Sequence, residues 1–372
     1  MRDIRERKLA DLLVTYSIEL QAGESCLINA VDVPLEMVEE LVAAVYRAGG
    51  YPVVNIDSQR LERAMTAGAT EESIAVWREC DLYRMQQMDT FIGIRGPANS
   101  RETADLPESR QELFMRGYYE PVHGRERVPN TRWVVLRYPT EIMAYAAGIS
   151  TVEFEKFYYR VTTEVDYQKI SAAMQPAVDF LEQADRVHIT GAGTDLRFSI
   201  RNMPVIPCDG RMNIPDGEIY TCPVRESVEG VITYNTPSTY QGVTFNNVSL
   251  EFSRGKIVRA TANNTERLNA ILDMDEGARY IGEFALGCNP AITFPMDNTL
   301  FDEKIMGSIH FTPGNAYDDC DNGNRSAIHW DLVAIQTPEY GGGEITIDGQ
   351  LIRKDGLFVH ESFTALNPDG LL

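Results

Sequence analysis

A histidine and an aspartate stand two residues apart near the C-terminal end of the sequence, as His329 and Asp331. In a β-strand, side chains two residues apart project from the same face, so this pair can reach one metal ion together. His310 lies a short way upstream on another strand-like segment, although the chain contains only five histidines in all. A histidine hydrogen-bonded to a nearby acid, with no metal, is the alternative interpretation of the pair.

Two glutamates and a tyrosine in the same half of the chain extend this set. Glu283 interrupts the apolar run 282–287, so the pattern predicts a buried carboxylate, which is costly unless it is paired with a cation or bound to a metal. An ordinary buried Glu–Arg pair is the alternative. Glu218 follows a Pro-Asp-Gly turn, where an exposed glutamate is the alternative, and Tyr317 comes seven residues after His310.

These segments together supply nitrogen and oxygen ligands, the donor types that zinc, cobalt and manganese accept. The patterns of several other enzyme classes are absent from the sequence, which has no His-Glu-x-x-His, no Gly-x-Ser-x-Gly and no Gly-Lys-Ser/Thr phosphate loop. The residues therefore predict a metal site, while their spacing alone names no reaction.

The elements expected to position these residues differ between the two halves of the chain. In the first half, helical periodicity alternates with short apolar runs that indicate buried strands at 26–30, 52–56, 90–94 and 133–136. A strand, a crossover helix and a second strand form a βαβ unit, and such units build parallel sheets. We therefore expect an α/β N-terminal domain with a mostly parallel sheet over residues 1–150, followed by a helical connector over 151–185.

From residue 186 onward the pattern changes to short alternating strands separated by dense turn signals, many of them Asp-Gly pairs. One helix interrupts these strands, from about Thr265 to Tyr280, with Asn264 or Thr265 as its cap. The sequence thus predicts that residues 186–372 form an α+β domain of mostly antiparallel β structure, and that this domain holds the metal site.

Composition and charge argue against several classes of partner. Lys and Arg total 34 against 55 Asp and Glu, a formal net charge of −21, which is unsuited to binding nucleic acid or an anionic membrane. No apolar stretch approaches the roughly 20 residues that cross a bilayer, and the charged N-terminus lacks the apolar segment of a secretory signal. Six scattered cysteines without a Cys-x-x-Cys pair are typical of free thiols in a reducing compartment, so we expect a cytoplasmic protein.

Several segments resemble the thermophilic aminopeptidase family, often called the aminopeptidase T family. The resemblance rests on Asn-Ile-Pro-Asp-Gly-Glu at 213–218, Gly-Glu-Phe-Ala-Leu-Gly at 282–287, Leu-Phe-Asp-Glu at 300–303, His310 with Tyr317, and Asn-Arg-Ser-Ala-Ile-His-Trp-Asp at 324–331. It covers about residues 185–360, and the N-terminal half resembles the family only in layout. Two spacings depart from the family's pattern, since the stretch 303–310 is longer and the stretch 317–329 is shorter.

The resemblance implies a metal-dependent aminopeptidase that uses two divalent metal ions (zinc, cobalt or manganese) on a small peptide substrate. Its metal ligands would be Glu218, Glu283, Glu303, His310, His329 and Asp331. A water held by both metals would be the nucleophile, and Tyr317 or Glu218 would stabilise the oxyanion or move a proton. The resemblance also implies a homodimer whose enclosed cavity limits access to small peptides.

The same scaffold resembles iron-dependent dioxygenases that open dihydroxypyridine rings, in which two histidines and one carboxylate hold a single ferrous ion. His310, His329 and Asp331 would supply that set. A mononuclear iron site has no need for Glu218 and Glu283, so their presence favours the two-metal peptidase. A catalytically silent scaffold, the third class, would be expected to lose some of these polar residues.

Overall fold

The computed structural model describes residues 3–96, 98–99 and 101–371 of the chain. It divides into two compact units, of which the first consists of Met1–Glu164 with Gly210–Ile214 and the second of Val165–Asp209 with Pro215–Leu372. The boundary after Glu164 falls within the helical segment expected over 151–185. The short excursion of residues 210–214 into the first unit was not anticipated by the sequence.

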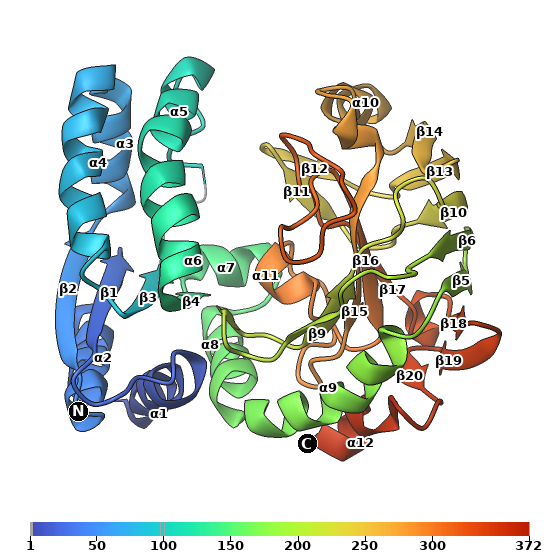
Figure 1. The fold of residues 1–372 in the computed structure, drawn as a ribbon, viewed down its shortest axis with the longest axis horizontal. Coiled ribbons are helices and arrows are strands. Elements are labelled where there is room, and N and C mark those ends of the chain that lie inside the picture. Colours follow the sequence, from blue (N-terminus) through green and yellow to red (C-terminus); the bar gives the residue numbers. More distant parts are fainter. Residues whose placement is uncertain (1–2, 97, 100, 372) are drawn as a thin grey trace. The chain divides into compact units, whose positions relative to one another are not determined.

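A parallel five-stranded sheet forms the centre of the N-terminal unit (Figure 1). Its order is β2 (Tyr51–Asp57), β1 (Ser25–Val31), β3 (Thr90–Arg95), β4 (Arg132–Arg137) and β8 (Asn213–Ile214). All four neighbouring pairs are parallel. The first four strands coincide with the apolar runs of the sequence, and the expected α/β unit with a mostly parallel sheet is confirmed.

One helix precedes the sheet, and the helices after it lie between its parallel strands along the chain, as βαβ crossovers require. They are α1 (Ile4–Leu12), α2 (Leu35–Arg47), α3 (Gln59–Gly68), α4 (Glu71–Met85), α5 (Glu108–Phe114), α6 (Val128–Asn130), α7 (Glu141–Ala146) and α8 (Thr151–Tyr159), with π-helical segments at Leu13–Ser17, Met115–Arg127 and Arg160–Glu164. In the crossover helix α2, Met37, Leu41 and Ala44 recur at helical spacing and are all buried. This is why the spacing of apolar residues in the sequence predicted a helix there.

The second unit begins with α9 (Tyr167–Leu181) and continues with two larger antiparallel sheets. The eight-stranded sheet runs β14 (Lys256–Thr261), β13 (Ser249–Ser253), β10 (Glu229–Thr233), β6 (Thr194–Ser199), β5 (Arg186–Gly191), β18 (Gly343–Ile347), β19 (Gln350–Lys354) and β20 (Leu357–Phe358). The five-stranded sheet runs β17 (Val333–Ile335), β16 (Ser308–Pro313), β15 (Ile281–Gly287), β9 (Glu218–Thr221) and β7 (Ile206–Cys208). A hairpin of β11 (Ser238–Tyr240) and β12 (Val243–Phe245) lies apart from both, and the expected mostly antiparallel unit is confirmed.

Aromatic rings join the two antiparallel sheets of the second unit. Phe198 of β6 lies 5.0 Å from Phe284 of β15 and 5.1 Å from Phe311 of β16, measured between ring centroids. Because strand side chains alternate between faces, this packing commits one face of β15 and β16 to the apolar core. The neighbouring positions on both strands must therefore point to the opposite face, where the polar residues are found.

The helix expected from Thr265 to Tyr280 is shorter than predicted. Helix α10 covers Thr265–Leu272, capped by Asn264, whose side chain accepts a hydrogen bond from the Arg267 amide. Only a separate 3₁₀ turn, Gly277–Arg279, follows it. The Asp275 carboxylate explains the break, since it accepts hydrogen bonds from the amides of Ala278 and Ala327 and so ties this segment to a distant loop.

The remaining helices of the second unit are α11 (Thr299–Asp302) and α12 (Pro368–Leu371), with 3₁₀ turns at Pro338–Tyr340 and Thr364–Leu366. In the described part of the chain, no helix combines the length and apolarity that a membrane span needs. All six cysteines are free.

Candidate metal centre

One face of the five-stranded sheet gathers the polar residues that the sequence singled out. In an antiparallel pair, residues directly opposite each other lie on the same face, as do alternate residues along one strand. The opposite pairs along β15 are Glu283 with Thr312, Ala285 with His310, and Gly287 with Glu218. The two small residues lie opposite the two longer polar side chains, so the sheet leaves room for a cluster on this face.

The turn before β9 brings Glu218 into this cluster. Gly217 precedes it with a φ of 126°, a conformation that residues with a Cβ rarely adopt. A Cβ at Gly217 would also meet the Cβ of Asn289 at 2.9 Å. The Pro-Asp-Gly turn is therefore a tightly packed entry to the strand, and Glu218 is only 5% exposed. The alternative of an exposed glutamate is wrong.

Glu283 lies between two histidines. Its Oε1 is 2.9 Å from His310 Nε2, and its Oε2 is 3.2 Å from His329 Nε2. The glutamate is 3% exposed, as the apolar run predicted, and its partners are imidazoles rather than an arginine. A single buried carboxylate thus has one oxygen for each histidine.

His329 and Asp331 meet as the two-residue spacing predicted, with His329 Nε2 at 3.2 Å from Asp331 Oδ1. The local structure differs from the expected strand, because His329 forms only an isolated bridge with Gly314 and the regular strand β17 starts at Val333. Thr312 donates a hydrogen bond of 2.8 Å to Asp331 Oδ1 and fixes its orientation. Extended backbone is enough to put both side chains on one side.

The hydrogen bonding of His329 favours a cation beside it. Its Nδ1 is 2.8 Å from the Asn315 carbonyl oxygen, which can only accept, so Nδ1 carries the proton of a neutral ring. Nε2 then presents a lone pair to two carboxylates, Glu283 and Asp331, and makes no hydrogen bond. Such an arrangement is repulsive unless a proton or a metal ion lies between these atoms, and metal-bound histidines commonly donate their other N–H to a carbonyl in this way.

The charges at the site shift several pKa values. Burial raises the pKa of Glu218 to about 7, opposed by the nearby Lys304 ammonium. Burial alone would lower the pKa of His310, but the negative Glu218 and Glu283 outweigh it and raise that pKa to about 10. Burial would likewise raise the pKa of Glu283, yet the neighbouring His310 and His329 hold it below its usual value.

The pKa values of His329 and Asp331 are shifted by the same two causes, burial and neighbouring charge. Burial would lower the pKa of His329, but Asp331 and Glu283 raise it well above the ordinary value. Burial would raise the pKa of Asp331, and the facing His329 instead holds it well below its usual range. When no metal is bound, the surrounding carboxylates therefore favour the doubly protonated, positively charged form of both imidazoles.

Among the residues that the structure describes, three groups of ligand-type side chains have donor atoms that all lie within 4.8 Å of one another. They are Glu218–Glu283–His310, Glu283–His329–Asp331 and Cys208–Asp216–Glu218. The first two share Glu283 and contain five of the six predicted ligands. Glu218 Oε2 and His329 Nε2 are buried without a hydrogen-bond partner in the described structure, so the donor set fits divalent cations that accept nitrogen and oxygen ligands.

Glu303, the sixth predicted ligand, follows α11 and lies in none of these three groups of described residues. Its Oε1 accepts a 2.6 Å hydrogen bond from the Lys304 ammonium. Tyr317 reaches the cluster through its ring, whose centroid is 4.5 Å from that of His329. The tyrosine is 44% exposed as a whole residue, while burial of its hydroxyl and the nearby carboxylate of Glu283 raise the pKa of that hydroxyl well above the ordinary value.

Two residues of the site were missed by reasoning from sequence alone. Lys304 is fully buried among carboxylates, and nothing in the local sequence around Asp302 and Glu303 distinguishes it from a solvent-exposed lysine. Thr312 could have been found, because it stands two residues after His310 and must share its face if that segment is a strand.

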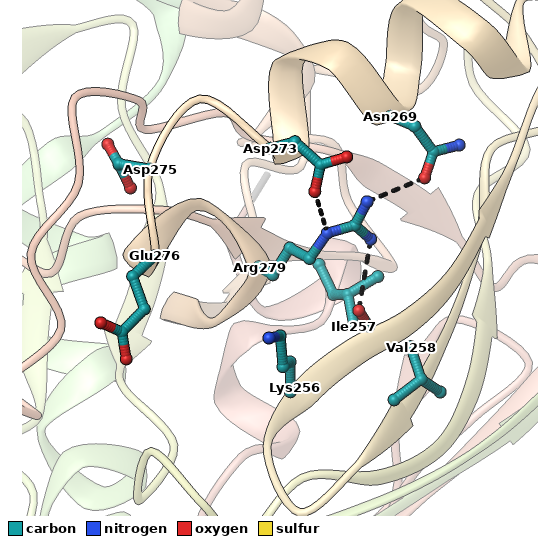
Figure 2. A pocket seen from close by; sticks show the side chains of 8 residues that line it. All are labelled: Lys256, Ile257, Val258, Asn269, Asp273, Asp275, Glu276 and Arg279. Atoms are coloured by element: carbon teal, nitrogen blue, oxygen red, sulfur yellow. Dashed lines mark hydrogen bonds and ion pairs between the residues drawn. The ribbon is translucent and has the colours of Figure 1, made fainter.

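A pocket of about 560 Å³ between β14 and α10 is a second polar location in this unit (Figure 2). Figure 2 shows dashed lines from the guanidinium of Arg279 to Asp273, Asn269 and the Ile257 carbonyl. These hydrogen bonds, which Arg279 donates, are 2.6, 3.0 and 3.3 Å long. The residues that line the pocket therefore already accept hydrogen bonds from the Arg279 guanidinium. None of the predicted ligands lines this pocket.

Curated proteins similar to this chain are aminopeptidases. Aminopeptidase T of Thermus thermophilus is 26% identical, in an alignment that covers 92% of this chain and 93% of the relative. Aminopeptidase AmpS of Bacillus subtilis is 30% identical, with 93% of this chain and 94% of the relative covered. The similarity therefore extends over both units.

Solved structures share the fold. Wild-type AmpT from Thermus thermophilus superimposes with a TM-score of 0.79 at 23% identity, covering 96% of this chain and 99% of the other. The structure of 2,5-dihydroxypyridine dioxygenase from Pseudomonas putida KT2440 gives a TM-score of 0.61 at 14% identity, covering 96% and 98%. At these identities the likenesses establish the common fold alone.

The buried carboxylate–imidazole cluster and the full-length matches define the class of this protein as a metallo-aminopeptidase, a hydrolase of peptide bonds. The family profile of the thermophilic metalloproteases (M29) matches residues 3–358. The chain belongs to that family, as the distinctive segments of the sequence predicted.

Proposed function

We propose that this aminopeptidase removes the N-terminal residue of small peptides with a water activated by two divalent metal ions. The observation that carries the proposal is the pair of donor groups that share Glu283. Glu218, Glu283 and His310 would hold one ion. Glu283, His329 and Asp331 would hold the other, with zinc, cobalt and manganese as the fitting metals.

Bound metals would supply a hydroxide near neutral pH and polarise the scissile carbonyl. Side chains and a backbone carbonyl of the protein would hold the metal ligands in place and contact the oxyanion. Thr312 and the Asn315 carbonyl fix Asp331 and His329, so the donor atoms are preorganised before substrate arrives. Tyr317, whose ring lies beside that of His329, can donate a hydrogen bond from its hydroxyl to the oxyanion. Glu218, the other predicted catalytic residue, would act as a ligand of the first ion.

The assignment of Glu303 as a metal ligand stays a prediction, because one of its oxygens is engaged by Lys304. The homodimer and the cytoplasmic location stay predictions as well. Sedimentation or light scattering of the purified protein would test the dimer.

The dioxygenase alternative requires His310, His329 and Asp331 to converge on a single ferrous ion. Among the described residues these three do not form one group, and each group that contains a histidine also contains Glu283. The geometry therefore favours two sites joined by a carboxylate over one facial triad.

The proposed function predicts that a chelator abolishes release of p-nitroaniline from Leu-p-nitroanilide and of amino acids from dipeptides. Activity should return on adding zinc, cobalt or manganese, with two ions bound per chain at saturation. Failure to hydrolyse any peptide with any of these metals would refute the proposal. Oxygen consumption with a hydroxylated pyridine and ferrous iron would then support the dioxygenase.

Replacing Tyr317 by phenylalanine keeps the ring on His329 and removes only the hydroxyl. We expect kcat to fall by roughly a hundredfold, the usual cost of losing one oxyanion donor, while the two metals remain bound. Measuring kcat, KM and metal content separates this role from a structural one. Tyr145→Phe, at a position 82% exposed, is the control and should behave as wild type. An unchanged kcat in Tyr317→Phe would exclude the hydroxyl from catalysis.

A further inference from the structure

Lys304 occupies an unusual position next to the metal centre. It follows α11, is 0% exposed, and its Nζ lies 2.6 Å from Glu218 Oε1 and 2.6 Å from Glu303 Oε1. A third carboxylate oxygen, Asp216 Oδ1, is 3.6 Å away. One buried ammonium therefore faces three carboxylates, an excess of negative charge that a simple ion pair would not have.

Glu218 connects this ammonium to the metal centre. Its Oε1 accepts from Lys304, whereas its Oε2 is buried without a hydrogen bond, 3.5 Å from His310 Nε2. Lys304 thus determines which oxygen of Glu218 is available to the group formed with Glu283 and His310. A carboxylate held in this way can give a metal one oxygen and cannot turn to bind it with both.

Glu218 also belongs to the third donor group. Cys208, Asp216 and Glu218 have donor atoms within 4.8 Å of one another, a spacing that could hold an ion. The Lys304 Nζ contacts two of these three residues, so the ammonium supplies the positive charge that would otherwise attract a divalent cation there.

We propose that Lys304 is a positioning residue that serves as a built-in monovalent cation. It restricts Glu218 to one metal-binding oxygen, weakens metal affinity at the Glu218–Glu283–His310 group, and excludes a third ion from the Cys208–Asp216–Glu218 group. The inference rests on the proposed two-metal function.

Lys304→Met tests the inference because it keeps the length of the side chain and removes its charge. The probe is zinc itself, titrated against a chromophoric chelator to obtain the number of ions bound and their dissociation constants. We expect wild type to bind two ions. The variant should bind a third ion. Its affinity for the ion at the Glu218–Glu283–His310 group should rise about tenfold or more, because a unit positive charge a few ångströms away has been removed.

Two further variants control for charge and for surface effects. Lys304→Arg keeps the positive charge and should still exclude the third ion. Lys354→Met removes a surface lysine that pairs with Glu344 at 2.9 Å, and should leave both stoichiometry and affinity unchanged. If loss of Lys304 merely loosened the fold, metal binding would weaken and no third ion would appear.

Unchanged zinc stoichiometry and affinity in Lys304→Met would overturn the inference, as would weaker binding. Should that variant fail to fold, Lys304→Gln removes the same charge while keeping an N–H donor for Glu218, and the affinity of the Glu218 site should still rise. Equal affinity in Lys304→Gln would also overturn it. A wild-type protein that binds no zinc or hydrolyses no peptide would instead refute the proposed function, so the two failures are distinguishable.

Discussion

Glu283→Gln is expected to reduce hydrolysis of Leu-p-nitroanilide by about a thousandfold or more while the protein stays folded. Glu283 belongs to both histidine-containing donor groups, so its replacement weakens two metal sites at once. Glutamine keeps the shape of the side chain but turns one oxygen into an N–H donor facing His310 or His329, where a negative oxygen now lies. Loss of a hydroxide-generating metal removes the largest contribution to the rate.

The measurement combines kcat/KM with the metal content of the same preparation and a circular-dichroism spectrum. Glu344→Gln is the matched control, since Glu344 lies on β18 in an exposed pair with Lys354, and its removal should leave activity and metal content unchanged. Wild-type activity in Glu283→Gln, with two metals still bound, would show that the shared carboxylate is not the centre of the site.

The alternation of residues on strands explains why most of the candidate site was predictable. In β15 and β16, polar Glu283 and His310 each stand beside an aromatic residue, Phe284 and Phe311, and period-2 geometry assigns the aromatic residues to the core and the polar ones to the opposite face. The N-terminal parallel sheet was predictable for a similar reason, because its strands are continuous apolar runs separated by helices.

Contacts between distant segments explain what the sequence did not reveal. Lys304 meets Glu218 across 86 residues of chain, and nothing in the local pattern around either residue indicates the other. Residues 213–214 pair with β4 of the first unit although the chain on either side of 210–214 belongs to the second. This segment is too short to show a hydrophobic periodicity in the sequence. Helix α10 ended early because Asp275 bonds to Ala327, a tertiary contact that outweighs helical propensity.

Metal binding is expected to release protons from His310 and His329. The pKa of His310 is raised to about 10 in the metal-free fold, above the ordinary value of 6.5, and that of His329 is also raised. His310 is therefore doubly protonated at pH 8, and the pKa of His329 is shifted in the same direction, whereas ligation needs neutral imidazole. In the metal-free protein, the stability from the ion pairs of His310 is complete below about pH 6.5 and is lost as pH rises through about 10.

Loading two zinc ions at pH 8 should accordingly release about two protons per chain, one from each imidazole, because Glu218 with a pKa of about 7 is already mostly ionised there. The affinity of the site that contains His310 should rise about tenfold per pH unit between pH 8 and 9, because one proton is displaced there. Calorimetry in buffers of different ionisation enthalpy counts the protons directly. His329→Ala should halve the count, while His188→Ala, on β5 and outside the three donor groups, should not alter it. Zinc binding without proton release would mean that both rings are already neutral, and the carboxylates around them would then need another source of positive charge.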